Sequence, residues 1–294
     1  MNAFTAADGT AAPAPVLSSL DLVFRAALLA GLGPHAQALT ATFGVAQAGA
    51  DARTCVDGGN GLLLLVSAPG GRSLQLLRRA HQPDQAGLMR WTRSAYAGRH
   101  EHRRSTIAAC RGEMAAAWEY AVALARATGH EDALRLRQSL LGWRGSIFSA
   151  EQPAAAGQPA LITWRLDRQL APQAALEACG MGAAWPAAEA AIAALTGRPV
   201  WQRIGPWSIA CSLDGARVRL GSSLWARMPE GPAKARGMAA VVEQFGGDGR
   251  FAEGLYRLIA DARPGRVVGR AVELELSERG VIGAEFYLAV PELG

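Results

Sequence analysis

The chain has 294 residues, a net charge of +5 and 50% apolar residues, which is enough for one large buried core or two small ones. No apolar run approaches the roughly 18 residues that a membrane helix needs, and residues 1–15 carry no basic residue ahead of the first apolar stretch, so neither a membrane span nor a signal peptide is predicted. We expect a cytoplasmic protein with a disordered tail over residues 1–16 and a single domain over residues 17–294.

The cysteines and the basic residues narrow the possible chemistry. The four cysteines lie far apart with no Cys-x-x-Cys pair, so they give neither a zinc signature nor a disulfide framework, and we expect free thiols in a reduced cytosol. Lys234 is the only lysine, so arginine carries nearly all the positive charge. The planar arginine fork suits phosphate, and a basic balance of this size fits an anionic ligand, although many proteins that bind none share it.

Apolar residues recur at helical spacing in several segments. The segment Ile107–Ala127 is long and alanine-rich, and the glycines at Gly246–Gly249 split the last pair of helices. The predicted helices are Leu17–Leu29, His35–Phe43, Ile107–Ala127, Glu131–Leu141, Pro172–Cys179, Pro186–Leu195, Pro232–Gln244 and Phe251–Ala260.

Between these helices, alternating segments separated by turn residues predict four antiparallel hairpins. The Asp214–Gly215 turn is the strongest signal. The predicted strand pairs are Ala52–Val56 with Leu62–Ser67 (extended by Ser73–Arg78), Trp143–Phe148 with Leu161–Asp167, Trp207–Leu213 with Ala216–Leu220, and Val267–Leu276 with Val281–Val290. Adjacent antiparallel pairs alternating with helix pairs indicate an α+β fold, and no glycine-rich phosphate loop supports a nucleotide-binding fold.

Along the predicted strands, apolar residues alternate with polar and charged ones. Trp164 shares the apolar face of its strand with Ile162 and Leu166, and Trp207 also falls on an apolar face. Helices can cover that face, and we assign both tryptophans to the core. The opposite, polar face would be solvated in an open sheet but would line a chamber in a closed barrel.

This order of elements resembles the ABBA-type aromatic prenyltransferases, and within them the branch that modifies cyanobactins and related ribosomal peptides. Three stretches carry the resemblance: Ala50–Asp57, with an acidic residue before a cysteine-containing strand; Leu161–Asp167, with a central arginine; and the late hairpin Ala271–Val290. It covers residues 37–294 as topology and implies an antiparallel barrel surrounded by helices. The family closes its barrel with five hairpins, so either one hairpin is hidden near Ser73–Arg78 or the barrel is incompletely closed.

The resemblance implies transfer of a dimethylallyl or longer prenyl group from its diphosphate to a small aromatic molecule or to a peptide side chain (Arg, Trp or Tyr). Diphosphate needs fixed cations because negative charge accumulates on it as the C–O bond breaks. The expected diphosphate ligands are the strand arginines Arg53, Arg165, Arg217 and Arg219. An allylic cation needs aromatic shielding from water, for which Tyr287 is the candidate.

A base must also remove a proton from the acceptor. Asp51 matches the acidic position of the family, and a carboxylate in a partly dry chamber can act as a base. Thr163, Glu273 and Glu285 complete the expected prenyl- and acceptor-binding set, and the acidic members would also attract a cationic acceptor. Plainer roles stay open, because strand arginines are commonly solvated, tyrosines are common in sheets and aspartates are common before strands.

No Asp-Asp-x-x-Asp motif is present, so we expect no tightly bound cofactor and no metal site, and leave open whether Mg²⁺ accompanies the prenyl diphosphate. His100, Glu101 and His102 lie in an arginine-rich run, residues 90–104, that is typical of a solvated loop or helix start. Alternatively, this run could form a lid over the diphosphate. We expect neither nucleic acid nor a membrane as a partner. The alternative functions are a non-catalytic module that binds a small ligand, and an interaction protein that contacts an acidic leader peptide.

Overall fold

The structure, a computed structural model, describes residues 19–33, 36–37, 62–69, 74–79, 88–97, 100–110, 114–141, 145–153, 160–166, 171–196 and 207–290. The predicted tail, the predicted strand Ala52–Val56 and most of the predicted helix His35–Phe43 lie outside these residues. The assignment of residues 17–294 to one domain stays a prediction.

The described residues contain ten strands, and every strand pairing is antiparallel. The strands are β1 Leu62–Ala68, β2 Leu74–Arg79, β3 Leu88–Ala97, β4 His100–Cys110, β5 Gly145–Pro153, β6 Leu161–Leu166, β7 Trp207–Ser212, β8 Val218–Ser222, β9 Gly269–Ser277 and β10 Gly280–Ala289.

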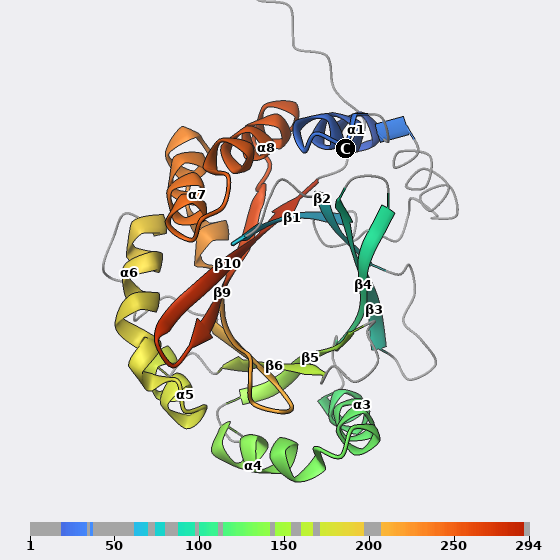
Figure 1. The fold of residues 1–294 in the computed structure, drawn as a ribbon, viewed down its shortest axis with the longest axis vertical. Helices are drawn as coiled ribbons and strands as arrows, with labels where there is room; N and C mark the ends of the chain where they lie inside the picture. The colour runs from blue at the N-terminus through green and yellow to red at the C-terminus, as the bar shows by residue number, and fades with distance from the viewer. Residues whose placement is uncertain are drawn as a thin grey trace, which may run out of the picture.

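Each strand pairs with its neighbours in chain order, and β10 pairs with β1 to complete a ring. At that junction Leu65 lies opposite Tyr287 and Ser67 lies opposite Glu285. Figure 1 shows the strands as a ring with the helices on its outside. The predicted α+β architecture, an antiparallel barrel surrounded by helices, is therefore confirmed.

The hairpin missing from the sequence prediction is β3–β4, which lies between two predicted segments. The arginine-rich run at residues 90–104 was expected to form a loop or helix start, but its described residues, 90–97 and 100–104, are paired strands, with Arg93 opposite Ser105. The predicted helix Ile107–Ala127 was also wrong at its start, because Ile107 belongs to β4 and the helix begins at Met114. Charged residues on both strands hid the period-two pattern. The sequence left open either a hidden hairpin or an incompletely closed barrel, and the observed strand pairings agree with a hidden hairpin. The predicted segment Ser73–Arg78 corresponds to β2, which pairs with β3.

Seven α-helices occur in the described residues, most of them close to the predicted ranges. They are α1 Ser19–Leu29, α3 Met114–Ala127, α4 Glu131–Leu141, α5 Pro172–Ala178, α6 Trp185–Thr196, α7 Pro232–Gln244 and α8 Gly249–Ala262, with short 3-10 turns η3 Gly182–Ala184 and η4 Leu224–Arg227. Local chemistry sets their starts. Pro232 occupies the first turn of α7, and the Asp248 side chain accepts a hydrogen bond of 2.8 Å from the Phe251 amide at the start of α8.

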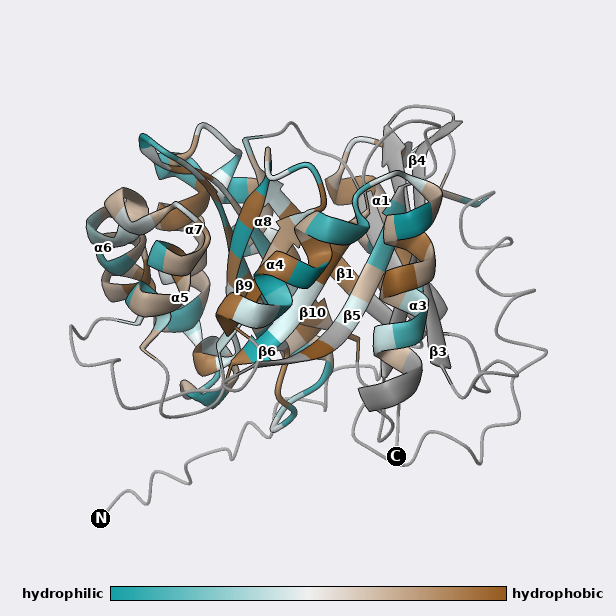
Figure 2. Ribbon diagram, turned by 90° about the horizontal axis from the view of Figure 1, so that it is seen from below, coloured by the Kyte–Doolittle hydropathy of each residue, from teal (hydrophilic) through white to brown (hydrophobic). Residues whose placement is uncertain are grey.

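The hydrophobic core lies between the helices and the outer face of the barrel. The outward strand residues are fully buried, as Ile162, Ile209 and Leu274 illustrate. Trp164 is also fully buried, and its Nε1 donates a hydrogen bond of 2.8 Å to Gln138 on α4, while Trp207 is 3% exposed. The assignment of both tryptophans to the core is thus confirmed. Figure 2 shows apolar and polar residues alternating along strands and helices, as this arrangement requires.

Candidate functional site

The strand register brings polar residues from six neighbouring strands into one row on the inner wall of the barrel. Because the alternate residues of these strands pack outward against the helices, the row faces inward. Directly opposed pairs link, in order, Arg165, Ser208, Gly221, Glu273, Glu285 and Ser67. We call these six residues the interior row.

A second set of contacts ties one end of the interior row into a network. The Tyr287 hydroxyl lies 2.9 Å from Glu273 Oε2 and 2.8 Å from Glu285 Oε2. Ser67 Oγ donates to Glu285 Oε1 at 3.1 Å. The phenol has a single proton, so it can donate fully to only one of the two carboxylates at a time. The two glutamates therefore compete for the proton of this hydroxyl.

Arg219 provides the positive charge of this network. Its Nη1 lies 3.5 Å from Glu273 Oε2 and 3.6 Å from Glu285 Oε2, and its side chain is 8% exposed. Burial at this level weakens solvent screening, so these charges interact more strongly than a surface pair. We call Ser67, Arg219, Glu273, Glu285 and Tyr287 the acidic cluster. One guanidinium against two carboxylates leaves it with a formal charge of −1 when both are ionised.

The middle of the interior row carries small side chains. Ser208 and Gly221 stand between Arg165 on β6 and Glu273 on β9. A Cβ added at Gly221 would overlap the Ser208 hydroxyl and lie 3.5 Å from Glu273 Cγ. Three strand spacings separate β6 from β9, about 14 Å along the wall. Ser208 and Gly221 therefore place no long side chain on the inner wall between Arg165 and the acidic cluster.

The predicted site residues divide into three groups within the described residues and a fourth outside them. Arg219, Glu273, Glu285 and Tyr287 come together in the acidic cluster. Arg217 instead pairs with Glu275 at 3.1 Å in a more exposed place, where the two side chains are 38% and 32% exposed. The predicted members on β6 line a neighbouring part of the wall, Thr163 half-buried and Arg165 exposed. Asp51 and Arg53 lie outside the described residues.

Sequence reasoning missed Ser67, Ser208 and Gly221. Ser67 ends an apolar strand, and its alternation against Val66 marks it as inward-facing, but only the β1–β10 pairing reveals that it contacts Glu285. The predicted strand ended at Leu220, so Gly221 was not assigned to the sheet, whereas β8 continues to Ser222. The guanidinium of Arg219 was expected to face diphosphate, whereas here it is engaged by two carboxylates. Its binding role stays a prediction.

Among the described residues, no group of three or more histidine, cysteine or acidic side chains is placed to hold a metal ion. In the same part of the chain, no helix is both long and apolar enough to cross a membrane.

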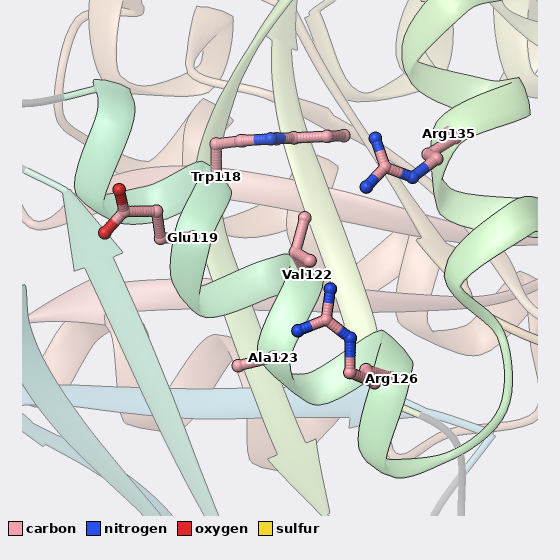
Figure 3. Close-up of a pocket in the computed structure, with 6 residues that line it drawn as sticks. All are labelled: Trp118, Glu119, Val122, Ala123, Arg126 and Arg135. Carbon is pink, nitrogen blue, oxygen red and sulfur yellow. The ribbon is translucent and has the colours of Figure 1, made fainter.

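A cavity of about 260 Å³ lies outside the barrel, between α3 and α4 (Figure 3). Trp118 and Arg126 from α3 and Arg135 from α4 line it. Glu131 forms ion pairs with Arg126 at 2.9 Å and with Arg135 at 2.6 Å. The hydrogen bond from Arg126, followed by that from Arg135, lowers the pKa of Glu131 to about 2. This cavity belongs to the helical layer and is separate from the acidic cluster.

No protein-family model matches the sequence, and no curated protein matches it. Solved structures do match in fold. The 6-dimethylallyltryptophan synthase from Micromonospora olivasterospora, in complex with DMASPP and Trp, superposes with a TM-score of 0.69 at 13% identity, covering 93% of this chain and 98% of that one. The 5-dimethylallyltryptophan synthase from Streptomyces coelicolor gives a TM-score of 0.69 at 12% identity, covering 94% and 98%.

A third match is PriB in a binary complex with product diphosphate, with a TM-score of 0.62 at 13% identity, covering 93% of this chain and 97% of that one. Coverage is nearly complete in both directions, so the similarity extends over the whole barrel. At this level of identity it establishes architecture. The chain therefore has the fold of the ABBA prenyltransferases.

Proposed function

We propose that this protein transfers a prenyl group from an allylic diphosphate to an electron-rich acceptor inside the barrel. The observation that carries the proposal is the acidic cluster on the inner wall of an ABBA barrel, in which a buried carboxylate, a half-buried carboxylate, a buried phenol and a buried guanidinium meet. Buried charged groups destabilise a fold unless they are well paired, and they concentrate at functional sites.

In the proposed reaction, the C–O bond of the allylic diphosphate breaks and its electron pair leaves with the diphosphate. The acceptor supplies the electron pair for the new bond to the allylic carbon and then loses a proton. Glu273 or Glu285 accepts that proton, because both carboxylates stand on the inner wall. Tyr287, only 8% exposed, shields the cationic centre from water with its ring.

The charge distribution suggests where the diphosphate lies. A dianionic or trianionic group is disfavoured beside the acidic cluster, whose formal charge is negative. Arg165 is the guanidinium of the interior row, and it stands across Ser208 and Gly221 from the carboxylates. We therefore assign the diphosphate to the Arg165 side, with Arg217 and the predicted ligand Arg53 as further candidates, and the acceptor to the side of the acidic cluster.

The acceptor is proposed at the level of class, as an aromatic ring or a nucleophilic side chain of a peptide. Three of the structures with this fold were solved with tryptophan and DMASPP or dimethylallyl thiolodiphosphate, which makes dimethylallyl diphosphate and tryptophan the first pair to test. The ribosomal-peptide branch indicated by the sequence makes peptides containing Arg, Trp or Tyr the second set.

The test is to incubate the purified chain with dimethylallyl or geranyl diphosphate and each acceptor, with and without Mg²⁺, and to analyse the products by mass spectrometry. The expected result is a mass gain of one prenyl unit, together with release of diphosphate. Glu273→Gln and Glu285→Gln should each reduce kcat/KM at least tenfold, whereas Glu253→Gln, a matched change in an ion pair on α8, should not. Binding of a prenyl diphosphate with no product from any acceptor would favour a non-catalytic binding module instead.

A further inference from the structure

Two cysteines far apart in the sequence meet where helix α5 packs against the barrel. Cys179 follows the last residue of α5, and Cys211 lies on β7, 32 residues further along the chain. Their sulfur atoms are 3.5 Å apart and both are free thiols. A disulfide bond is about 2.05 Å long, so closure requires the sulfurs to approach by roughly 1.5 Å.

The two thiols sit in different surroundings. Cys179 is half-buried, whereas Cys211 is fully buried on the outward face of β7. The Cys211 thiol donates a hydrogen bond to Cys179 Sγ. That bond, opposed by burial and assisted by the Arg137 guanidinium, lowers the pKa of Cys179. The same bond, together with burial, raises the pKa of Cys211.

A hydrogen bond fixes the position of the Arg137 guanidinium, which helps to lower the pKa of Cys179. Its Nη1 donates a short hydrogen bond to the main-chain carbonyl of Ser212, the residue after Cys211. A fixed guanidinium favours the thiolate form of a nearby cysteine, and the thiolate is the nucleophile in thiol–disulfide exchange. Accessibility and electrostatics therefore both select Cys179 as the attacking residue.

We propose that Cys179 and Cys211 form an oxidisable dithiol, in which Cys179 attacks a low-molecular-weight disulfide and Cys211 resolves the product into a bond between α5 and the barrel wall. In the first step the Cys179 thiolate bonds to one sulfur of the small disulfide, and the other sulfur leaves as a thiolate. In the second step Cys211, after losing its proton, bonds to Cys179 Sγ and expels the second small thiol. The protein loses two hydrogens, and one small disulfide becomes two thiols.

Closure joins the helical layer to the wall without entering the chamber. The inward neighbours of Cys211 on β7 are Ala210 and Ser212, while Cys211 itself belongs to the outer core. The bond would restrict a long loop in the unfolded chain, so the midpoint of thermal unfolding should rise by on the order of 5 °C.

The experiment uses the full chain equilibrated with mixtures of reduced and oxidised glutathione, quenched with acid, alkylated and digested with trypsin. Arg203 lies between the two cysteines, so trypsin separates them and a cross-linked peptide pair is diagnostic. The expected result is a Cys179–Cys211 cross-link that increases with the oxidised fraction and disappears after reduction. Absence of this cross-link from the folded wild-type protein at every ratio would overturn the proposal, and this readout needs no variant.

Two variants test the assigned order of attack. Cys211→Ser should stop at a glutathione adduct on Cys179, and Cys179→Ser should leave Cys211 unmodified. Variants at Cys55 and Cys110 serve as controls and should still form the cross-link. Modification of Cys211 in Cys179→Ser at the wild-type rate, with circular dichroism showing a folded protein, would contradict the order.

Discussion

Replacing Tyr287 by phenylalanine removes the hydroxyl that lies within hydrogen-bond distance of both Glu273 and Glu285. A hydrogen bond to a charged group contributes about 1.5–3 kcal/mol. Two carboxylate oxygens lie within 2.9 Å of the hydroxyl, but one proton can satisfy only one of them, so the loss corresponds to one bond rather than two. We expect Tyr287→Phe to lower the free energy of unfolding by about 2 kcal/mol and the thermal midpoint by about 4–8 °C.

Chemical denaturation of the wild type, Tyr287→Phe, Glu273→Gln and the double variant measures this effect as a cycle. The hydroxyl bonds Glu273 directly, so the double variant should be more stable than the sum of the single changes predicts, by about 1 kcal/mol. Additive effects, or an unchanged unfolding free energy in Tyr287→Phe, would refute the shared-donor geometry. In the proposed reaction the same variant should also lower kcat/KM, because the second carboxylate loses its donor.

Three further predictions concern single sites. Gly221→Ala should lower the unfolding free energy by about 1–3 kcal/mol, because the new Cβ overlaps the Ser208 hydroxyl. Adding Ser208→Ala should restore most of the lost stability. If denaturation experiments show no such rescue, the overlap with Ser208 is not the cause of the loss. Burial, and then the hydrogen bond to Glu230, raise the pKa of Tyr256, so stability should fall as the pH rises above about 10, where the unfolded tyrosine ionises. Above pH 10, the thermal midpoint of Tyr256→Phe should fall less steeply with pH than that of the wild type. If the two curves of thermal midpoint against pH are parallel, Tyr256 is not the cause of the loss. The pKa of Glu131 is lowered to about 2, so ionised Glu131 stabilises the fold above its ordinary pKa of 4.5, and this stabilisation is lost as the pH falls toward 2. Glu131→Gln should therefore make stability less dependent on pH between about 4.5 and 2. An unchanged dependence on pH in this variant would exclude the effect.

The period-two pattern of single strands made the inner and outer faces of the barrel predictable. Trp164 and Arg165 are adjacent in sequence, and the alternation placed the first in the core and the second on the opposite face, as observed. The same reasoning marked Glu273, Glu285 and Tyr287 as members of one polar face. Local alternation depends only on backbone geometry, which is why it could be read without knowing the neighbours of each strand.

Partners across strands could not be predicted in this way. Ser67 reaches Glu285, 218 residues away, only because β1 pairs with β10 in one particular register. Cys179 and Cys211 meet because a helix packs on a strand, and no spacing in the sequence encodes that contact. The β3–β4 hairpin was missed because arginines and histidines interrupt the apolar residues along both segments of the sequence.

Under the proposed function, the acidic cluster constrains how the barrel holds a prenyl diphosphate and an acceptor at the same time. A prenyl diphosphate is strongly anionic, so in the proposed reaction Glu273 and Glu285 repel it, and the Arg219 guanidinium already faces both carboxylates. An acceptor that must lose a proton gains from the same environment, because a nearby carboxylate favours the developing positive charge. Ser208 and Gly221 stand between these carboxylates and Arg165, so one row of residues has an acidic end and a basic end with only small residues between them. In the proposed reaction, the electrostatics of the wall orient donor and acceptor, and we expect the allylic carbon to lie over Ser208 and Gly221, between the two ends of the interior row.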